Sequence, residues 1–340
     1  MQSKDINSVP NGTLVAKNNR LQQLKKLDWR NYIDWRNYIV YLAFIGVIIY
    51  FSISLYDEGF VTADNFLNIV RQTAMISLMG LAMTFVISTG EIDLSVGSIT
   101  ALSSLTAALA LQSGLGLIGG VFVGLATGLL VGLVNGLLVT KVAIPSFLVT
   151  LGTMGIVKGL AMWITDTAPV PIVNSTFNFL FGSGNVGPIP ILLIWTLVFT
   201  IIAHILLRKT SFGRQTLATG GNESAARFSG VNTLKIKLLV FLGSGLMAGL
   251  AGLLYAGRMH AGRFTFGEGD ELSVIAAVIL GGTSLFGGVG TVIGTVIGSL
   301  MIGTINNGLI IMGLDVSEQM MIKGAIIILA VAFGRKSMKK

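Results

Sequence analysis

Few side chains in this 340-residue sequence could perform acid–base, nucleophilic or metal chemistry. The chain has no cysteine and only two histidines, His204 and His260. These numbers argue against a thiolate nucleophile and against a His- or Cys-ligated metal centre. The glycine-rich run at 281–290 lacks the lysine of a phosphate-binding loop, and no such loop occurs elsewhere. We therefore expect a chain that is not an enzyme and binds no ATP, metal or other cofactor itself.

A small set of polar residues lies within or beside apolar stretches, where ionisable side chains are costly and usually functional. Such residues could line a pathway for a polar solute. The candidates are Glu91, Asp93, Ser95, Asn135, Lys158, Asn306 and Asn307.

Each candidate also has a structural interpretation. Glu91 and Asp93 could belong to a solvated cytoplasmic turn in which Asp93 or Ser95 caps the next helix. Lys158 could form an ion pair or contact backbone carbonyls. The asparagines could face a sugar-sized substrate, but for any single one we favour a hydrogen bond that joins two helices.

The composition places these residues in a membrane protein. Hydrophobic residues make up 53% of the chain and charged residues 11%, whereas soluble domains carry about 25% charged residues. The mean hydropathy is +0.81. We interpret the net charge of +8 as a topology signal and expect lipid, not nucleic acid, as the environment.

Apolar runs of roughly 17–25 residues indicate membrane-spanning helices. About ten such runs occur, at 39–55, 70–89, 95–112, 115–139, 146–165, 190–207, 238–257, 272–286, 289–312 and 318–333. The sequence therefore predicts an all-α polytopic protein with a transmembrane domain at 38–334. An N-terminal segment at 1–37 precedes this domain, and a basic tail at 335–340 follows it.

Lysine and arginine are concentrated in the N-terminal segment, in the loop at 208–237 and in the tail. With ten spans these regions share one side, which the positive-inside rule assigns to the cytoplasm. Acidic residues gather in the opposite loops, so we expect both termini to be cytoplasmic. The basic stretch 14–39 contains the hexapeptide DWRNYI twice and predicts an interfacial helix on the inner leaflet.

Glycine stripes predict where helices approach closely, because small residues allow backbones to pack together in membranes. The glycines lie at Gly120, Gly124, Gly128, Gly132, Gly136, Gly290, Gly294 and Gly298. Both stripes lead to an Asn-Gly-Leu triplet, at 135–137 and 307–309. Because the fourth and ninth spans run in opposite directions, the pair indicates an inverted repeat of spans 2–5 and 7–10. We expect the run at 281–290 to be a cytoplasmic turn or a pathway lining, since it cannot continue a helix.

A short helix is predicted within the loop at 208–237. Asn222 can cap its first turn, Glu223 suits its positive end, and Ser229-Gly230 can close it. A small, alanine-rich helix could dock in another protein or could be an ordinary loop helix. The residues of this candidate docking element are Gly220, Gly221, Asn222, Glu223, Ala225, Ala226, Ser229 and Gly230.

Several motifs resemble a known family when taken together. They are GEIDLSVGS (90–98), IPSFLVTLGTM (144–154), TSFGRQTLATGGNESAARFSGVN (210–232), ELSVIAAVILGGTSLFGGVGTVIGT (271–295) and INNGL (305–309). In order and spacing they resemble the permease subunits of bacterial ABC sugar importers, in the branch that transports ribose, xylose and arabinose. The resemblance covers about residues 40–334.

The resemblance implies a multi-pass protein of the bacterial inner membrane that pairs with a second permease copy, as a homodimer or with a close relative. It implies two cytoplasmic ATP-binding subunits that dock on the helix near 221–230 and carry the ATP and magnesium. It also implies a periplasmic or lipid-anchored solute-binding protein at the outer face. ATP would switch the permease pair between outward and inward states.

Two other classes of function are alternatives to the sugar-importer permease. An ion- or proton-coupled secondary transporter of a small polar solute would use Lys158, Asp93 and Glu91 as coupling groups and would need no partner. A membrane-embedded enzyme is disfavoured, because histidine, cysteine and paired acids are scarce within the spans.

Overall fold

The computed structural model describes the backbone of residues 35–336. The chain divides into two units, residues 1–39 and Val40–Lys340, and the second unit is described here. The predicted interfacial helix at 14–39 and the doubled hexapeptide fall mostly outside the described residues, as does the end of the basic tail.

Helices occupy the predicted spans. They are α2 (Trp35–Ser54), α3 (Ala63–Ser88), α4 (Val96–Gln112), α5 (Gly116–Thr140), α6 (Ser146–Trp163), α8 (Ile191–Lys209), α11 (Thr233–Met259), α12 (Asp270–Leu280), α13 (Val292–Ile311) and α14 (Val316–Lys336). Within the described part of the chain, six of them are long and apolar enough to cross a membrane: α3, α5, α6, α8, α11 and α13. The all-α polytopic fold is confirmed.

The eighth span is shorter than the predicted 272–286. Helix α12 has only 11 residues and ends at Leu280. Glycines at 282, 287 and 288 adopt positive φ angles of 92°, 84° and 79°, which end the helix and turn the chain before α13. The backbone there returns to Ser88, whose carbonyl accepts a hydrogen bond from the Gly288 N–H at 3.0 Å.

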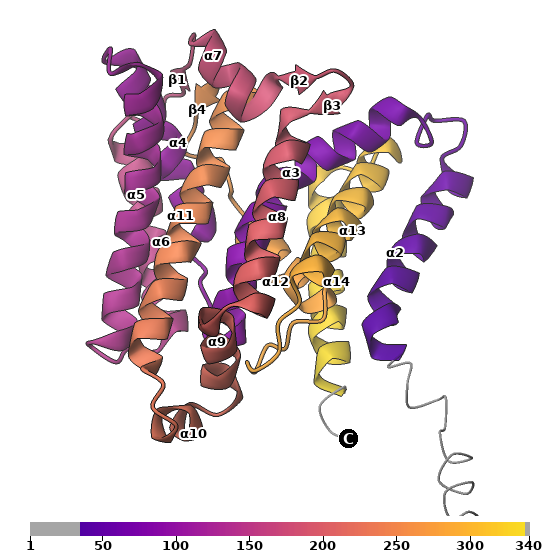
Figure 1. Ribbon diagram of the computed structural model, residues 1–340. Helices are drawn as coiled ribbons and strands as arrows, with labels where there is room; N and C mark the ends of the chain where they lie inside the picture. Colours follow the sequence, from indigo (N-terminus) through magenta and orange to yellow (C-terminus); the bar gives the residue numbers. More distant parts are fainter. Residues whose placement is uncertain (1–34, 337–340) are drawn as a thin grey trace, which may run out of the picture. The chain divides into compact units, whose positions relative to one another are not determined.

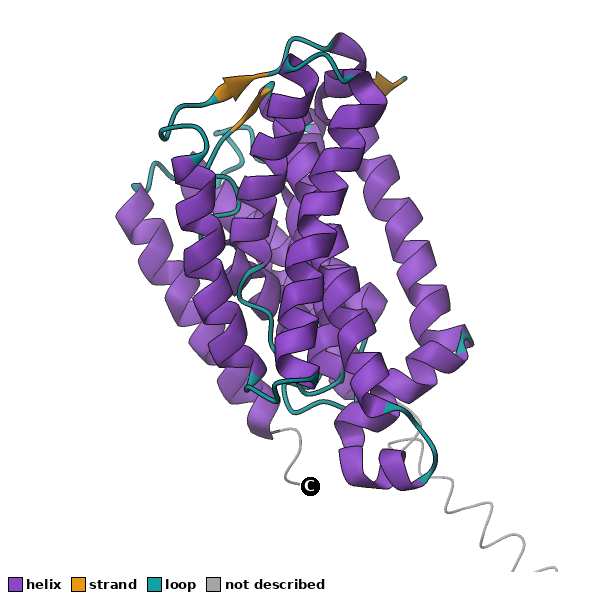
Figure 2. Cartoon of the chain, turned by 90° about the vertical axis from the view of Figure 1, so that its left-hand side faces the viewer, coloured by secondary structure: helices purple, strands orange, loops and turns teal. Residues whose placement is uncertain are grey.

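Small elements gather at the two ends of the helices (Figures 1 and 2). One end carries α7 (Ser175–Asn178), the π-helical turn η2 (Phe179–Ser183) and two short antiparallel ribbons. The ribbons pair β1 (Val170–Pro171) with β4 (Ala261–Gly262), and β2 (Asn185–Val186) with β3 (Ile189–Pro190). The opposite end carries α9 (Ser211–Gly221) and α10 (Glu223–Phe228).

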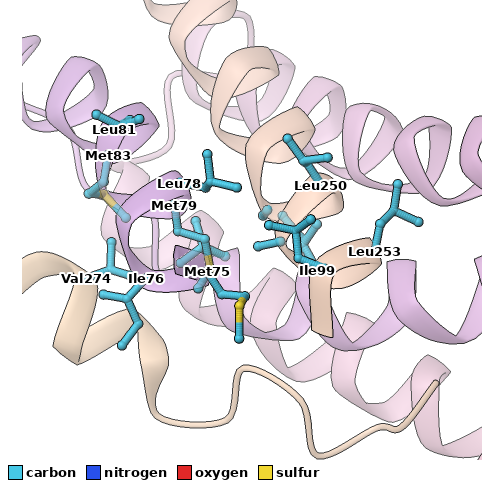
Figure 3. Close-up of a cluster of buried hydrophobic side chains, with 14 of the residues drawn as sticks. Met75, Ile76, Leu78, Met79, Leu81, Met83, Ile99, Leu250, Leu253 and Val274 are labelled. Carbon is cyan, nitrogen blue, oxygen red and sulfur yellow. The ribbon is translucent and has the colours of Figure 1, made fainter. Parts of the chain in front are cut away.

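Helix α3 forms the centre of the core. Its buried residues run without interruption from Thr73 to Ser88, so it is covered on every side by other helices. Figure 3 shows Leu78 and Met79 of α3 beside Ile99 of α4 and Leu250 of α11. Thr62 caps the start of α3 by accepting a hydrogen bond from the Asn65 N–H, so the helix begins seven residues before the predicted span.

The glycine stripe of α5 lies against α11 and α4. A Cβ atom at Gly128 would overlap the carbonyl of Gly245 and lie 2.9 Å from the Gly249 Cα. Gly132 meets Gly245 and Phe241 in the same way, and Gly124 meets Ser103 and Leu253. The α5–α11 contact is therefore made backbone to backbone, which only glycine allows.

We expect Gly128→Val to lower the free energy of unfolding by about 1–3 kcal/mol, because the added methyl groups force α5 away from α11. Thermal unfolding of the purified protein in detergent would measure the loss. Gly159→Val is the matched control, since a Cβ at Gly159 of α6 meets no atom within 4 Å. Equal melting temperatures for the two variants would contradict this packing argument.

Candidate functional site

The chain between α3 and α4 is a non-helical segment buried among helices. From Glu91 to Asp93 it passes along α11. Glu91 pairs with Lys237 near the start of that helix, and Asp93 contacts Ser244. Ser244 lies eleven residues beyond Thr233, the first residue of α11, which is roughly 16 Å along the helix. We call Thr89–Ser95 the inner break.

Asp93 is completely buried within this inner break. Its Oδ1 accepts hydrogen bonds from the N–H (3.0 Å) and Oγ (2.6 Å) of Ser95, and its Oδ2 accepts one from Ser244 Oγ (2.7 Å). Asn135 Nδ2 donates to Ser95 Oγ at 2.8 Å, which extends the cluster to α5. Because Ser95 directly precedes α4, the carboxylate also lies at the positive end of that helix. The site is therefore a dry helix-start cluster, and the solvated-turn interpretation of Asp93 is wrong.

A second non-helical segment leads from β4 to α12, and we call Arg263–Gly269 the outer break. The Arg263 N–H donates to Ser104 Oγ of α4 at 3.3 Å. A Cβ at Gly97, in the first turn of α4, would overlap the Gly267 carbonyl. The outer break thus descends along α4 until it meets the helix start that follows the inner break.

The two breaks carry the same short motif, Gly-Glu-x-Asp, at 90–93 and 267–270. In both, the glutamate forms an ion pair: Glu91 with Lys237 at 2.7 Å and Glu268 with Lys158 at 2.5 Å. In both, the aspartate accepts a hydroxyl hydrogen bond from α11; Tyr255 donates to Asp270 Oδ2 at 2.7 Å.

This correspondence was missed from the sequence, although the motif itself was the available signal. It matches the third span to the eighth, as an inverted repeat of spans 2–5 and 7–10 requires. The second glycine stripe, which leads into α13, packs against the ends of two other helices: Gly290 lies against Ser88 at the end of α3, and Gly294 and Gly298 lie against Gly281 and Ala277 at the end of α12.

The remaining pathway candidates divide into two kinds. Asn307 joins α13 to the start of α3 through two reciprocal hydrogen bonds with Asn65, at 3.0 and 2.9 Å. Asn306 Oδ1 is buried and has no hydrogen-bond partner among the described residues. Lys158 and Glu268, in contrast, stay 40% and 57% exposed even though they form an ion pair. Among these three candidates, Lys158 is therefore the one that carries a charge and has a largely exposed side chain.

The predicted loop helix is present as α10. Asn222 Oδ1 accepts from the Ala225 N–H at 2.9 Å, Ser229 ends the helix, and Gly230 turns the chain at a φ of 85°. Gly220 and Gly221 instead end α9, where a Cβ at Gly220 would overlap the Ser88 carbonyl. Gly220 thus packs against the end of α3, whereas Gly221 lies beside Gly288 in the turn before α13.

The exposed surface of α10 differs from the expected one. Ala226 is only 5% exposed and packs against its own chain, whereas Ala225 is exposed. Phe228, which we did not select from the sequence, is 93% exposed. An isolated phenylalanine carries no spacing signal, so only the structure distinguishes it from a core residue.

Glu223 fixes α10 to α11. Its carboxylate accepts hydrogen bonds from Lys237 Nζ (2.7 Å), Arg227 (2.6 Å) and Thr233 Oγ1 (3.1 Å). The hydrogen bond and charge of Lys237, aided by Arg227 and Thr233, lower the pKa of Glu223 below its ordinary value near 4.5 and outweigh the opposing effect of burial.

The lowered pKa of Glu223 predicts a pH dependence. The stabilisation is fully present above the ordinary pKa and is lost as the pH falls through the lowered pKa of the folded state. We expect Glu223→Gln to lower the melting temperature at pH 7, and the difference from wild type to shrink below pH 4.5. A constant difference across that range would show that the carboxylate charge is not responsible.

Comparison with known proteins identifies the family. Residues 65–331 match the family described as branched-chain amino acid transport system / permease component. The ribose import permease protein of Bacillus subtilis (strain 168) is 44% identical over 285 residues, covering 84% of this chain and 88% of the relative. The L-arabinose transport system permease protein of Escherichia coli (strain K12) is 38% identical over 286 residues, covering 84% and 87%. No solved structure matches.

These relatives are permease subunits of sugar importers, and they match the present chain over most of its length. The apolar helices agree with that assignment, as does the resemblance seen in the sequence motifs. The chain therefore belongs to the branched-chain amino acid transport system / permease component family, as a multi-pass inner-membrane permease subunit of an ABC sugar importer.

Proposed function

We propose that this chain moves a pentose, ribose or a close relative, across the inner membrane with energy supplied by separate ATP-binding subunits. The similarity to ribose and arabinose permeases supports the choice of substrate. The structural observation that carries the proposal is α10, a capped helix at one end of the helices that presents Phe228 with 93% of its surface exposed. Aromatic side chains, phenylalanine included, are enriched in protein–protein interfaces.

In this proposal α10 docks on the ATP-binding subunit through Phe228, Ala225 and Ser224, all of which are exposed. ATP and magnesium bind to that subunit and not to this chain. The opposite end of the helices, with α7 and the two β-ribbons, receives the solute-binding protein. We propose that α10 faces the cytoplasm, the side that the positive-inside rule assigns to its basic loop.

We propose further that Lys158 and Glu268 line the sugar pathway between two copies of the chain. An ion pair this exposed within the helical part of a membrane protein is costly in lipid but not beside water. On α6, Gly155 lies on the same side of the helix as Lys158, and a Cβ added there would meet no described atom within 4 Å. A second copy facing this surface would complete a water-filled passage lined by both copies.

The absence of cysteine makes this pathway directly testable. A cysteine at Gly155, one helical turn before Lys158, should react with a water-soluble, membrane-impermeant maleimide in intact vesicles. A cysteine at Ile156, which points away from Lys158 and is 73% exposed, should stay unreacted in lipid. If both positions were labelled equally, or if neither were labelled, the proposal that water contacts the Lys158 side of α6 would lose its support.

The function itself is tested by reconstitution. This chain, its ATP-binding subunits and its binding protein should together take up ribose into proteoliposomes in an ATP-dependent manner. The chain alone, supplied with a proton or sodium gradient, should not. Gradient-driven uptake by the chain alone would favour the secondary-transporter hypothesis with Lys158, Asp93 and Glu91 as coupling groups.

A further inference from the structure

Lys237 lies between helix α10 and the inner break, and it forms an ion pair with each. Its Nζ is 2.7 Å from Glu223 Oε2, at the first residue of α10, and 2.7 Å from Glu91 Oε1, within the inner break. The side chains of Lys237 and Glu91 are only 13% and 14% exposed. Breaking a pair at this burial would leave an uncompensated buried charge, which is costly. The two side chains therefore stay together.

Both ends of this bridge are attached to rigid structure. At the α10 end, Arg227 and Thr233 also bind the Glu223 carboxylate, so the helix moves together with that side chain. At the other end, the N–H of the next residue, Ile92, donates to Ser146 Oγ of α6 at 3.2 Å. Asp93 then anchors the chain at the start of α4. A shift of α10 therefore reaches α4 and α6 through one lysine and two residues of backbone.

Among the described residues, no corresponding ion pair links α10 to the outer break. The equivalent glutamate there, Glu268, pairs with Lys158 of α6, whose side chain is three times as exposed as that of Lys237, 40% against 13%. The glutamate of the repeated motif therefore pairs with an exposed lysine at the outer break and with a largely buried lysine at the inner break. At the inner break its lysine partner also reaches the helix that faces the ATP-binding subunit.

We propose that Lys237 transmits the movement of the docked α10 to the inner break and so couples ATP hydrolysis to the opening of the pathway at α4. This inference rests on the proposed function, since it requires an ATP-binding subunit at α10. It assigns Lys237 as a positioning residue that contacts neither sugar nor nucleotide.

A purely structural role would look different. If Lys237 only neutralised Glu91, then removing both charges together would relieve the damage caused by removing one. If Lys237 transmits movement, the double variant would remain defective, because the bridge is still missing. Glu223 keeps Arg227 as its partner in either case.

The experiment uses the complete importer in proteoliposomes and measures sugar transported per ATP hydrolysed, together with co-purification of the ATP-binding subunits. We expect Lys237→Met and the double variant Lys237→Met/Glu91→Gln each to lower that ratio about tenfold while the complex stays assembled. Lys237→Arg should retain coupling. Lys235→Met is the matched control, since Lys235 is exposed on the same helix and makes no ion pair within residues 40–326.

Several outcomes would overturn the inference. They are recovery of the ratio in the double variant, an unchanged ratio in Lys237→Met, and loss of the assembled complex in both variants. If one of these outcomes occurs while the wild-type complex couples normally, the role of Lys237 is overturned and the proposed function stands. A wild-type complex with no ATP-dependent uptake would instead overturn the proposed function, and the inference with it.

Discussion

Replacing Phe228 with serine should weaken binding of the ATP-binding subunit to the permease about 30-fold, the equivalent of about 2 kcal/mol. The side chain is 93% exposed on a helix whose ends are fixed by Asn222 and Ser229, so its burial in a partner would cost little ordering of the backbone. Because α10 is only six residues long, no other large apolar side chain on it can replace the contact. Sugar uptake should fall with the loss of the ATP-binding subunit.

The measurement is co-purification of the ATP-binding subunit over a range of permease concentrations, followed by uptake in proteoliposomes. Val173→Ser is the matched control: Val173 is 94% exposed but lies just after β1, at the opposite end of the helices. It should bind the ATP-binding subunit as wild type does. Wild-type affinity in Phe228→Ser would refute the docking role of α10.

Replacing Asp93 with alanine should lower the stability of the permease by about 3–5 kcal/mol. The carboxylate accepts three hydrogen bonds, from Ser95 N–H, Ser95 Oγ and Ser244 Oγ, in a site without solvent access. Removing the acceptor leaves these donors buried and unpaired, at about 1–3 kcal/mol each. The start of α4 would also lose its negative partner.

Asp93→Asn separates hydrogen bonding from charge. Its amide oxygen can still accept from the N–H and hydroxyl of Ser95, so we expect this variant to fold and to lose less than half as much stability. Asp57→Ala, on an exposed loop, is the control and should melt as wild type does. Thermal unfolding in detergent and the yield of monodisperse protein report the result. A folded, fully stable Asp93→Ala would contradict the buried cluster.

The amino-acid sequence alone was enough to predict the helical membrane fold. The reason is physical: a backbone in lipid must satisfy its hydrogen bonds internally, so each long apolar run becomes a helix. The same local logic predicted α10, since Asn222, Glu223 and Gly230 act on the backbone within a few residues of themselves. The confirmed family also followed from motifs whose order and spacing are linear properties of the chain.

The tertiary structure decided what the polar residues contact. Asp93 and Ser244 are 151 residues apart in the sequence, and Lys158 and Glu268 are 110 apart. No local sequence pattern predicts such pairings. They depend on the rotation of each helix about its axis and on the depth at which a non-helical segment enters the core. The same holds for Ala226 and Phe228, two positions apart on one helix: packing buried the first and exposed the second.

The sequence holds few side chains that could perform chemistry, and the structure gives its scarce charged residues specific positions. From the sequence, Glu91 and Lys158 were isolated polar residues in apolar stretches. In the fold each belongs to an ion pair at one of two facing breaks, built from the same Gly-Glu-x-Asp motif. Local backbone physics made the helices predictable, whereas the contacts that position these charges formed only when distant segments packed together.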